Sequence, residues 1–116
     1  MKKHVMKKWV KALRSGEYSQ GHHQLVDDNN NFCCLGVLCD IAPNYVRGEW
    51  EDSNSFYKKW SMYGNVATLP SQIQAWAGMS SFNGYIGDGL SLVDYNDQGS
   101  SFAEIADIIE KHWEGL

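Results

Sequence analysis

The sequence predicts one α+β domain in which helices outweigh strands and a small antiparallel, aromatic-rich hairpin or meander supplies the sheet. Two segments, residues 1–16 and 101–112, place apolar side chains at helical spacing. Residues 45–69 alternate aromatic side chains with Asp, Ser, Asn and Gly, which is typical of short strands joined by turns. The 116 residues are too few for two independent cores, so we expect residues 1–116 to form one compact domain.

The N-terminal segment is predicted to be a basic amphipathic helix. Val5, Trp9 and Leu13 recur at helical spacing, and Gly16 supplies a stop. Five lysines and one arginine, with no acidic residue, give residues 1–16 a charge of +6. A solvated surface is the ordinary interpretation of such a basic face, and a surface that faces an anion is the alternative.

The next two segments differ sharply in polarity. Residues 17–31 are polar and predict an irregular connection with one short strand at 23–26. Residues 32–42 are apolar, contain all three cysteines and end before Pro43, which favours a helix at the buried centre of the domain. Val37 and the cysteines would also suit a strand.

The C-terminal half predicts two further helices. Residues 69–77 have helical spacing, with Pro70 in the first turn and Gly78 at the end. Residues 78–89 read as a connection, 90–95 fit either a strand or a helical turn, and 96–99 have the composition of a turn. Ser101 and Glu104 have the spacing of a capping box, which predicts a helix over residues 101–112.

Charge and composition exclude several classes of protein. The net charge of −4 and the pI of about 5.4 argue against a duplex nucleic-acid partner and against an anionic membrane surface. The sequence shows no apolar run near the ~20 residues of a membrane span and no signal peptide, so we expect a soluble protein. Three cysteines, two of them adjacent, favour reduced thiols over a disulfide scaffold, so we expect a cytoplasmic protein. Residues 88–116 carry −6, so the two ends of the chain are expected to attract each other.

The cysteines and histidines invite a metal or thiol hypothesis. Cys33, Cys34 and Cys39 follow His22 and His23, but the cysteines are adjacent or five apart rather than paired as ligands. We therefore expect no metal and no cofactor, with the cysteines as small apolar residues of the core. A cysteine nucleophile with a histidine base is the alternative.

Two polar segments suit a small anionic ligand. Arg14 and Lys11 offer charge to a phosphate, and Tyr18 offers a ring on which a base can stack. Near the capped helix, Asn96 and Asp97 offer polar groups from a second side, although tightening a local turn is the alternative role. The predicted ligand-binding residues are Lys11, Arg14, Tyr18, Gln20, Asn96, Asp97 and Ser101.

Three segments together also carry a family resemblance. They are WVKALRSGEYSQ at 9–20, FCCLGVLCD at 32–40, and Asn96-Asp97 followed by SFAEIADIIE at 101–110. Over most of its length the chain resembles a family of small accessory proteins encoded by tailed phages and prophages. The resemblance implies a phage protein in the cytoplasm of the bacterial host, where such proteins often bind a host protein or a nucleotide signal of antiviral defence.

These observations lead to one functional expectation and two alternatives. We expect a non-enzymatic binder that sequesters a small anionic, nucleotide-like signal as a phage counter-defence protein. The first alternative is a protein-interaction module whose Trp50, Tyr57 and Trp60 anchor a host protein or a homo-oligomer. The second is a hydrolase of a nucleotide signal that uses Asp94, Asp97 or a histidine.

Overall fold

The computed structural model describes residues 1–47 and 67–116, and within them it confirms the α+β class. The helices are α1 (Lys3–Arg14), α2 (Cys34–Ile41), α3 (Asn44–Arg47), α5 (Ser71–Ala77), α6 (Leu92–Asp97) and α7 (Phe102–His112), followed by the 3-10 turn η1 (Trp113–Gly115). The strands are β1 (Ser19–Gln20), β2 (Asn31–Phe32), β3 (Tyr85–Gly87) and β4 (Leu90–Ser91), which form two separate pairs.

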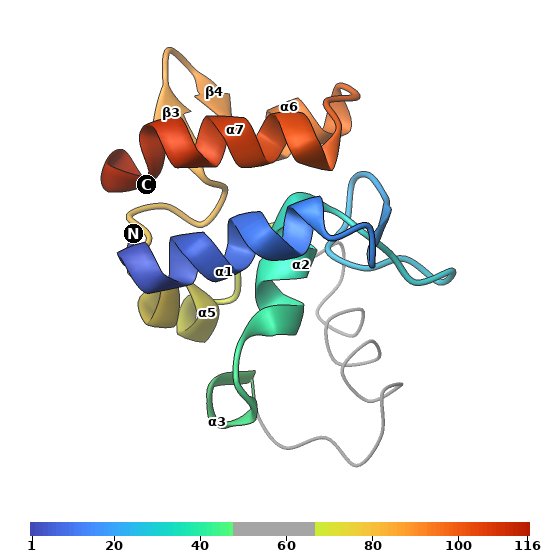
Figure 1. Cartoon of the computed structure of the whole chain (residues 1–116), viewed down its shortest axis with the longest axis horizontal. Coiled ribbons are helices and arrows are strands. Elements are labelled where there is room, and N and C mark those ends of the chain that lie inside the picture. Colours follow the sequence, from blue (N-terminus) through green and yellow to red (C-terminus); the bar gives the residue numbers. More distant parts are fainter. Residues whose placement is uncertain (48–66) are drawn as a thin grey trace.

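Helices α1 and α7 lie side by side and run in opposite directions (Figure 1). Each buries one apolar stripe, including Val5 and Trp9 of α1 and Ile105 and Ile109 of α7. At one end of the pair, the amino group of Met1 donates a hydrogen bond to the carbonyl oxygen of Trp113 at 3.0 Å. The two ends of the chain therefore lie next to each other, and Arg14 of α1 pairs with Asp107 and Glu110 of α7.

Helix α2 forms the predicted buried centre. Six of its eight residues are buried, and the indole Nε1 of Trp9 donates to the carbonyl oxygen of Cys34 at 2.9 Å. Gly36 lets α2 approach the loop before it, because a Cβ at this position would lie 1.9 Å from the carbonyl oxygen of Leu25. This close contact fixes the loop against the helix.

The loop between α1 and α2 differs from the prediction. Its strands are β1 and β2, which pair in parallel with Gln20 opposite Phe32. The strand predicted at 23–26 is wrong, since only Val26 forms an isolated bridge to Phe32. The physical reason lies at His23, whose φ of 69° is in the left-handed region and interrupts an extended run.

The hairpin of β3 and β4 was not predicted. Strand β3 and the hairpin tip lie within the stretch predicted as a connection at 78–89, and the tip passes through Asp88 at a φ of 56°. Residues 90–95 are partly strand and partly helix, because Ser91 and Asp94 form a capping box that starts α6 at Leu92. The turn predicted at 96–99 is corrected accordingly, with Asn96 and Asp97 belonging to α6.

Two predicted helices are confirmed with their caps. Helix α5 follows Pro70 and ends at Gly78, which adopts a left-handed φ of 70°. Helix α7 begins with both hydrogen bonds of the Ser101–Glu104 capping box. Most of the aromatic segment predicted as a hairpin or meander at 45–69 lies outside the described residues, and its described start belongs to α3. In the part of the chain that the structure describes, none of the helices combines the length and apolar character needed to cross a membrane.

Candidate functional site

The predicted site residues Gln20, Asn96 and Asp97 come together in one hydrogen-bond network. The Oδ1 of Asn96 accepts from the backbone N–H of Cys34 at 3.1 Å and from the Nε2 of Gln20 at 2.9 Å. Its Nδ2 donates to the carbonyl oxygen of Gly21 at 2.9 Å and to Asp97 at 3.2 Å. The two segments that the sequence predicts on opposite sides of one site therefore do meet.

This network leaves the Asn96 side chain with no hydrogen-bonding position that a ligand could use. The side chain is 0% exposed, and its two donor and two acceptor positions all have protein partners. Asp97 is engaged as well, since Oδ1 accepts from the backbone N–H of His23 at 3.0 Å and Oδ2 lies 3.4 Å from His23 Nδ1. The network joins α6, α2 and the loop after β1.

The remaining predicted residues lie in other places. The guanidinium of Arg14 contacts Asp107 at 2.6 Å and Glu110 at 2.5 Å, and hydrogen bonds to Glu110 and Asp107 raise the pKa of Arg14. The hydroxyl of Tyr18 donates to Asp40 at 2.5 Å, while its ring packs edge-on against Phe32. Ser101 caps α7, and Lys11 is exposed on α1. The seven predicted residues thus do not form one continuous site.

The cysteines have the environment of core residues. Cys33, Cys34 and Cys39 are all buried. Burial raises the pKa of Cys33 to about 11, and burial raises the pKa of Cys34 well above its usual value, which disfavours the nucleophilic thiolate. Among residues 1–47 and 67–116, no three His, Cys, Asp or Glu side chains are grouped so that they could hold a metal ion.

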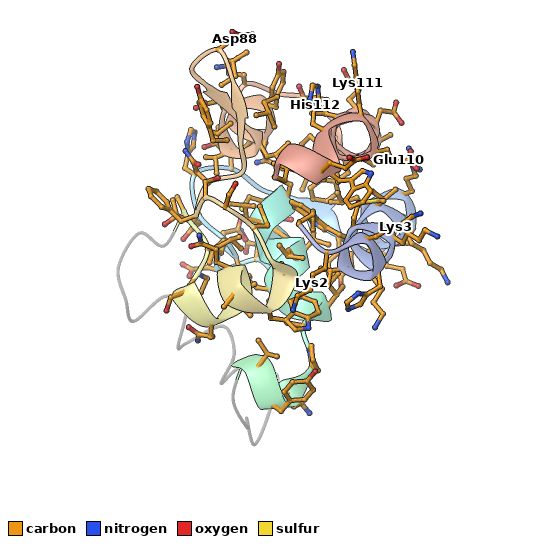
Figure 2. The ribbon with its side chains drawn as sticks, turned by 90° about the vertical axis from the view of Figure 1, so that its left-hand side faces the viewer. Lys2, Lys3, Asp88, Glu110, Lys111 and His112 are labelled. Atoms are coloured by element: carbon orange, nitrogen blue, oxygen red, sulfur yellow. The ribbon has the colours of Figure 1, made fainter. Side chains whose placement is uncertain are left out.

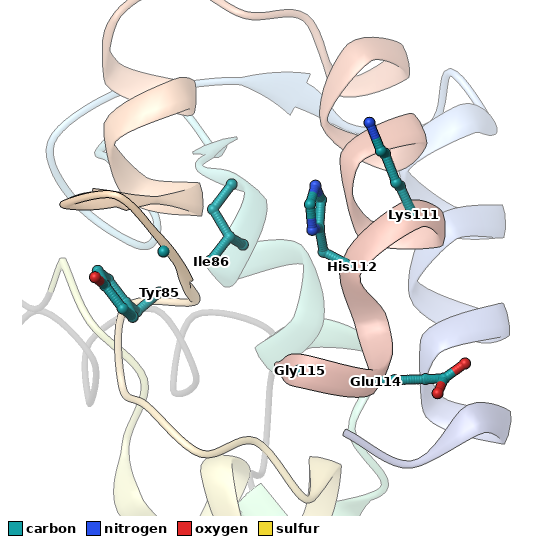
Figure 3. Close-up of a pocket in the computed structure, with 7 residues that line it drawn as sticks. Tyr85, Ile86, Lys111, His112, Glu114 and Gly115 are labelled. Carbon is teal, nitrogen blue, oxygen red and sulfur yellow. The ribbon is translucent and has the colours of Figure 1, made fainter.

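A cavity of about 580 Å³ lies between the β3–β4 hairpin and the C-terminal end of α7 (Figure 3). Figure 3 shows the Ile86 side chain pointing toward His112 across this cavity, with Lys111 at its rim. The side chain of Glu114 points away from it, and that of Tyr85 points to the other side of the hairpin. The full lining consists of Tyr85, Ile86, Gly87, Lys111, His112, Glu114 and Gly115.

Local structure explains these orientations. Successive side chains of a strand point to opposite faces, so Tyr85 and Ile86 diverge. The backbone N–H of Gly89 donates to the hydroxyl of Tyr85 at 3.4 Å, so this ring leans toward the hairpin tip. Lys111 and His112 occupy the last turn of α7, where the helix dipole favours basic side chains. The cavity therefore has a basic wall facing an apolar one.

Comparison with protein families shows the family to which the chain belongs. The family described as Domain of unknown function (DUF8296) matches residues 1–113. The chain belongs to this family. No curated protein and no solved structure matches the chain.

The sequence did contain a signal for the cavity of this DUF8296 protein. Helix α7 is acidic until its last turn, where Lys111 and His112 follow each other, and neither is among the residues predicted to bind a ligand. Lys111 is exposed and forms no ion pair within the described parts of the chain, whereas Arg14 forms two. Of these two cations, Lys111 is the one available to a ligand.

Proposed function

We propose that the protein binds a small anionic, nucleotide-like molecule in the cavity between the hairpin and α7, and holds it without turning it over. The observation that carries this proposal is the pairing of Lys111 and His112 on one wall with Ile86 on the other. An ammonium and an imidazole suit a phosphate, and an apolar wall suits the face of a base. The volume of about 580 Å³ lies within the range of small-molecule pockets.

This proposal keeps the ligand class expected from the sequence and changes the place where it binds. The guanidinium of Arg14 is already neutralised by Asp107 and Glu110, and Asn96 is saturated by internal hydrogen bonds. A phosphate at Arg14 would have to displace two carboxylates that are already in contact with the cation. At Lys111 it would displace no carboxylate of the described residues, because Lys111 forms no ion pair with them.

Retention of the ligand is proposed because the cavity presents few groups suited to hydrolysis. Of its lining residues, His112 and Glu114 are the candidates for a general base, and the carboxylate of Glu114 points away from the cavity. A protein that binds a signal without consuming it lowers the free concentration of that signal in proportion to its own amount. This stoichiometric action fits the phage counter-defence role that the family resemblance suggests.

A thermal-shift screen tests the proposal. The probes are cyclic dinucleotides, cyclic oligonucleotides and ADP-ribose-derived nucleotides, each recovered afterwards and identified by mass spectrometry. A ligand at a hundred times its Kd stabilises the folded state by about 2.7 kcal/mol, which corresponds to a rise in Tm of roughly 10 °C for a chain of this size. We expect this rise for at least one probe, with the probe recovered intact.

Variants locate the binding site. Lys111→Ala and His112→Ala should reduce the shift, and the control Lys8→Ala, which removes an exposed lysine on α1, should leave it unchanged. Recovery of an altered probe would replace sequestration by the hydrolase alternative. The absence of a shift for every probe would contradict the proposal and favour the protein-interaction alternative, whose predicted anchors Trp50, Tyr57 and Trp60 lie outside the described residues.

A further inference from the structure

The exposed side of α1 carries a row of basic side chains that form no ion pair with any acid of the described residues. Lys3, Lys7 and Lys11 are spaced four residues apart, which places them on one side of the helix. All three are exposed, and none has an ion-pair partner within residues 1–47 and 67–116. Only Arg14, one turn beyond Lys11, reaches the acids of α7.

This row lowers the stability of the isolated helix. Like charges four residues apart repel each other, and α1 has no acid in its first turn. Lys3 also stands at the N-terminal end, where the helix dipole is positive. A charge pattern that opposes the local structure is expected where something outside the molecule compensates it.

The neighbouring helix carries the complementary charge. The side chains of Asp107 and Glu110 on α7 are 75% and 50% exposed, even though both contact Arg14. Figure 2 shows Lys3 and Glu110 on the same side of the molecule. We call the exposed surface that carries Lys3, Lys7, Lys11, Asp107 and Glu110 the two-helix face; it holds a basic stripe beside an acidic one.

We propose that the two-helix face binds the same face of a second copy of this chain. A two-fold axis parallel to the helices places the basic α1 of each copy opposite the acidic α7 of its partner. The alternative two-fold axis lies in the plane of the interface, perpendicular to the helices. It would place the basic α1 of one copy against the basic α1 of the other, and this contact is repulsive. Both complementary contacts form at once in such a symmetric interface, because each copy supplies both stripes.

This inference stands apart from the proposed ligand site. Figure 3 shows α7 between the cavity and α1, and none of the residues that line the cavity belongs to the two-helix face. A long polyanion such as nucleic acid is a poorer occupant, because it would run from α1 onto the acids of α7 in a protein of net charge −4. The second copy avoids this conflict.

The contact is expected to be weak and salt-sensitive. A helix of the 12 residues of α1 is about 18 Å long, so two such helices offer a surface below that of a standard stable interface. Most of its attraction comes from exposed charges, which are screened over about 8 Å at physiological salt. We therefore expect a dimer at low ionic strength and a monomer at high ionic strength.

Sedimentation of charge-reversed variants tests the arrangement. One variant, Lys3→Glu with Lys7→Glu and Lys11→Glu, makes both stripes acidic, and a second, Asp107→Lys with Glu110→Lys, makes both basic. Each variant alone should be monomeric at about 20 mM salt, where the Debye length exceeds 20 Å. Their equimolar mixture should form a heterodimer, because every α1 then faces an α7 of opposite charge. Circular dichroism checks that both variants are folded.

A matched pair of single variants places the contact on one side of α1. Lys7→Glu should abolish the dimer, whereas Lys8→Glu, about 100° further around the helix and away from Arg14, should weaken it less. A wild-type protein that stays monomeric at low salt, or a mixture of the two reversed variants that does not associate, would overturn the proposal. Binding of a single-stranded oligonucleotide by a monomer, lost in Lys7→Glu, would overturn it in favour of nucleic acid.

Discussion

Replacement of Asn96 by alanine removes the most highly connected polar side chain of the described structure and should destabilise the protein severely. The change leaves the backbone N–H of Cys34 and the carbonyl oxygen of Gly21 without their partner, and both residues are buried. An unsatisfied buried polar group costs about 1–3 kcal/mol, so the two together cost about 2–6 kcal/mol. Gln20 and Asp97 are half-buried and can turn to water, so their loss adds little.

Urea denaturation followed by circular dichroism measures this loss. Because a domain of this size is stable by only about 5–15 kcal/mol, Asn96→Ala should lower the midpoint sharply at unchanged slope. Gln20→Ala is the matched control, since it removes one donor to Asn96 and one to the Ser100 carbonyl oxygen, and should cost about 1–2 kcal/mol. A loss below about 1 kcal/mol for Asn96→Ala would show that water satisfies both backbone groups and would refute the reasoning.

Three further predictions follow from individual contacts. Gly36→Ala should prevent folding or lower the free energy of unfolding by more than about 3 kcal/mol, because its Cβ would lie 1.9 Å from the Leu25 carbonyl oxygen. The control Gly115→Ala, which has open space around it, should leave the free energy of unfolding unchanged in the same urea assay. The thiol of Cys33, whose pKa burial raises to about 11, should react with iodoacetamide at least about tenfold more slowly in the native protein than in urea, and equal rates would contradict the burial. Burial raises the pKa of Asp27, but hydrogen bonds from Asn31 and Asn29 outweigh it and lower this pKa below its usual value. The carboxylate of Asp27 therefore stabilises the fold above the unfolded pKa of about 4, and this stabilisation is lost as the pH falls through the lower folded pKa. The stability difference between the wild type and Asp27→Asn should therefore close in acid, and a difference that stays constant down to about pH 2 would argue against it.

Periodicity and capping predicted the long helices because their signals are local. The apolar spacing of α1 and the Ser101–Glu104 box of α7 each lie within a few turns of chain. The same reasoning could have found α6, since Ser91 and Asp94 have the spacing of a capping box. Residues 96–99, Asn-Asp-Gln-Gly, have the composition of a turn, although the first two of them are the last residues of this short helix.

The pairing of β1 with β2 could not be predicted from the sequence, for a different reason. Strands β1 and β2 have two residues each, too few for alternation to appear, and their register depends on how the loop packs over α2. The left-handed conformation of His23 is also set by its tertiary contacts, because its backbone N–H is held by Asp97 from α6. Contacts across 74 positions leave no local signature.

The site was predicted only in part because residue type does not reveal how a side chain is used. Arg14 and Asn96 are typical ligand-binding residues, but the fold occupies both with internal partners. The sequence does predict that Gln20 and Asn96 lie near each other, and the two side chains form a hydrogen bond. The proposed role of Lys111 and His112 depends on the hairpin opposite them, and the sequence does not predict that hairpin.

Calorimetric titration of the best thermal-shift probe into two variants tests the location of the ligand most directly. Lys111→Ala should weaken binding about 10- to 100-fold, as expected for a hydrogen bond to a charged group. Arg14→Ala should leave the Kd within about twofold, because that guanidinium is already held by two carboxylates. The opposite result, with binding lost in Arg14→Ala and kept in Lys111→Ala, would contradict the cavity as the site and return the ligand to the residues predicted from the sequence.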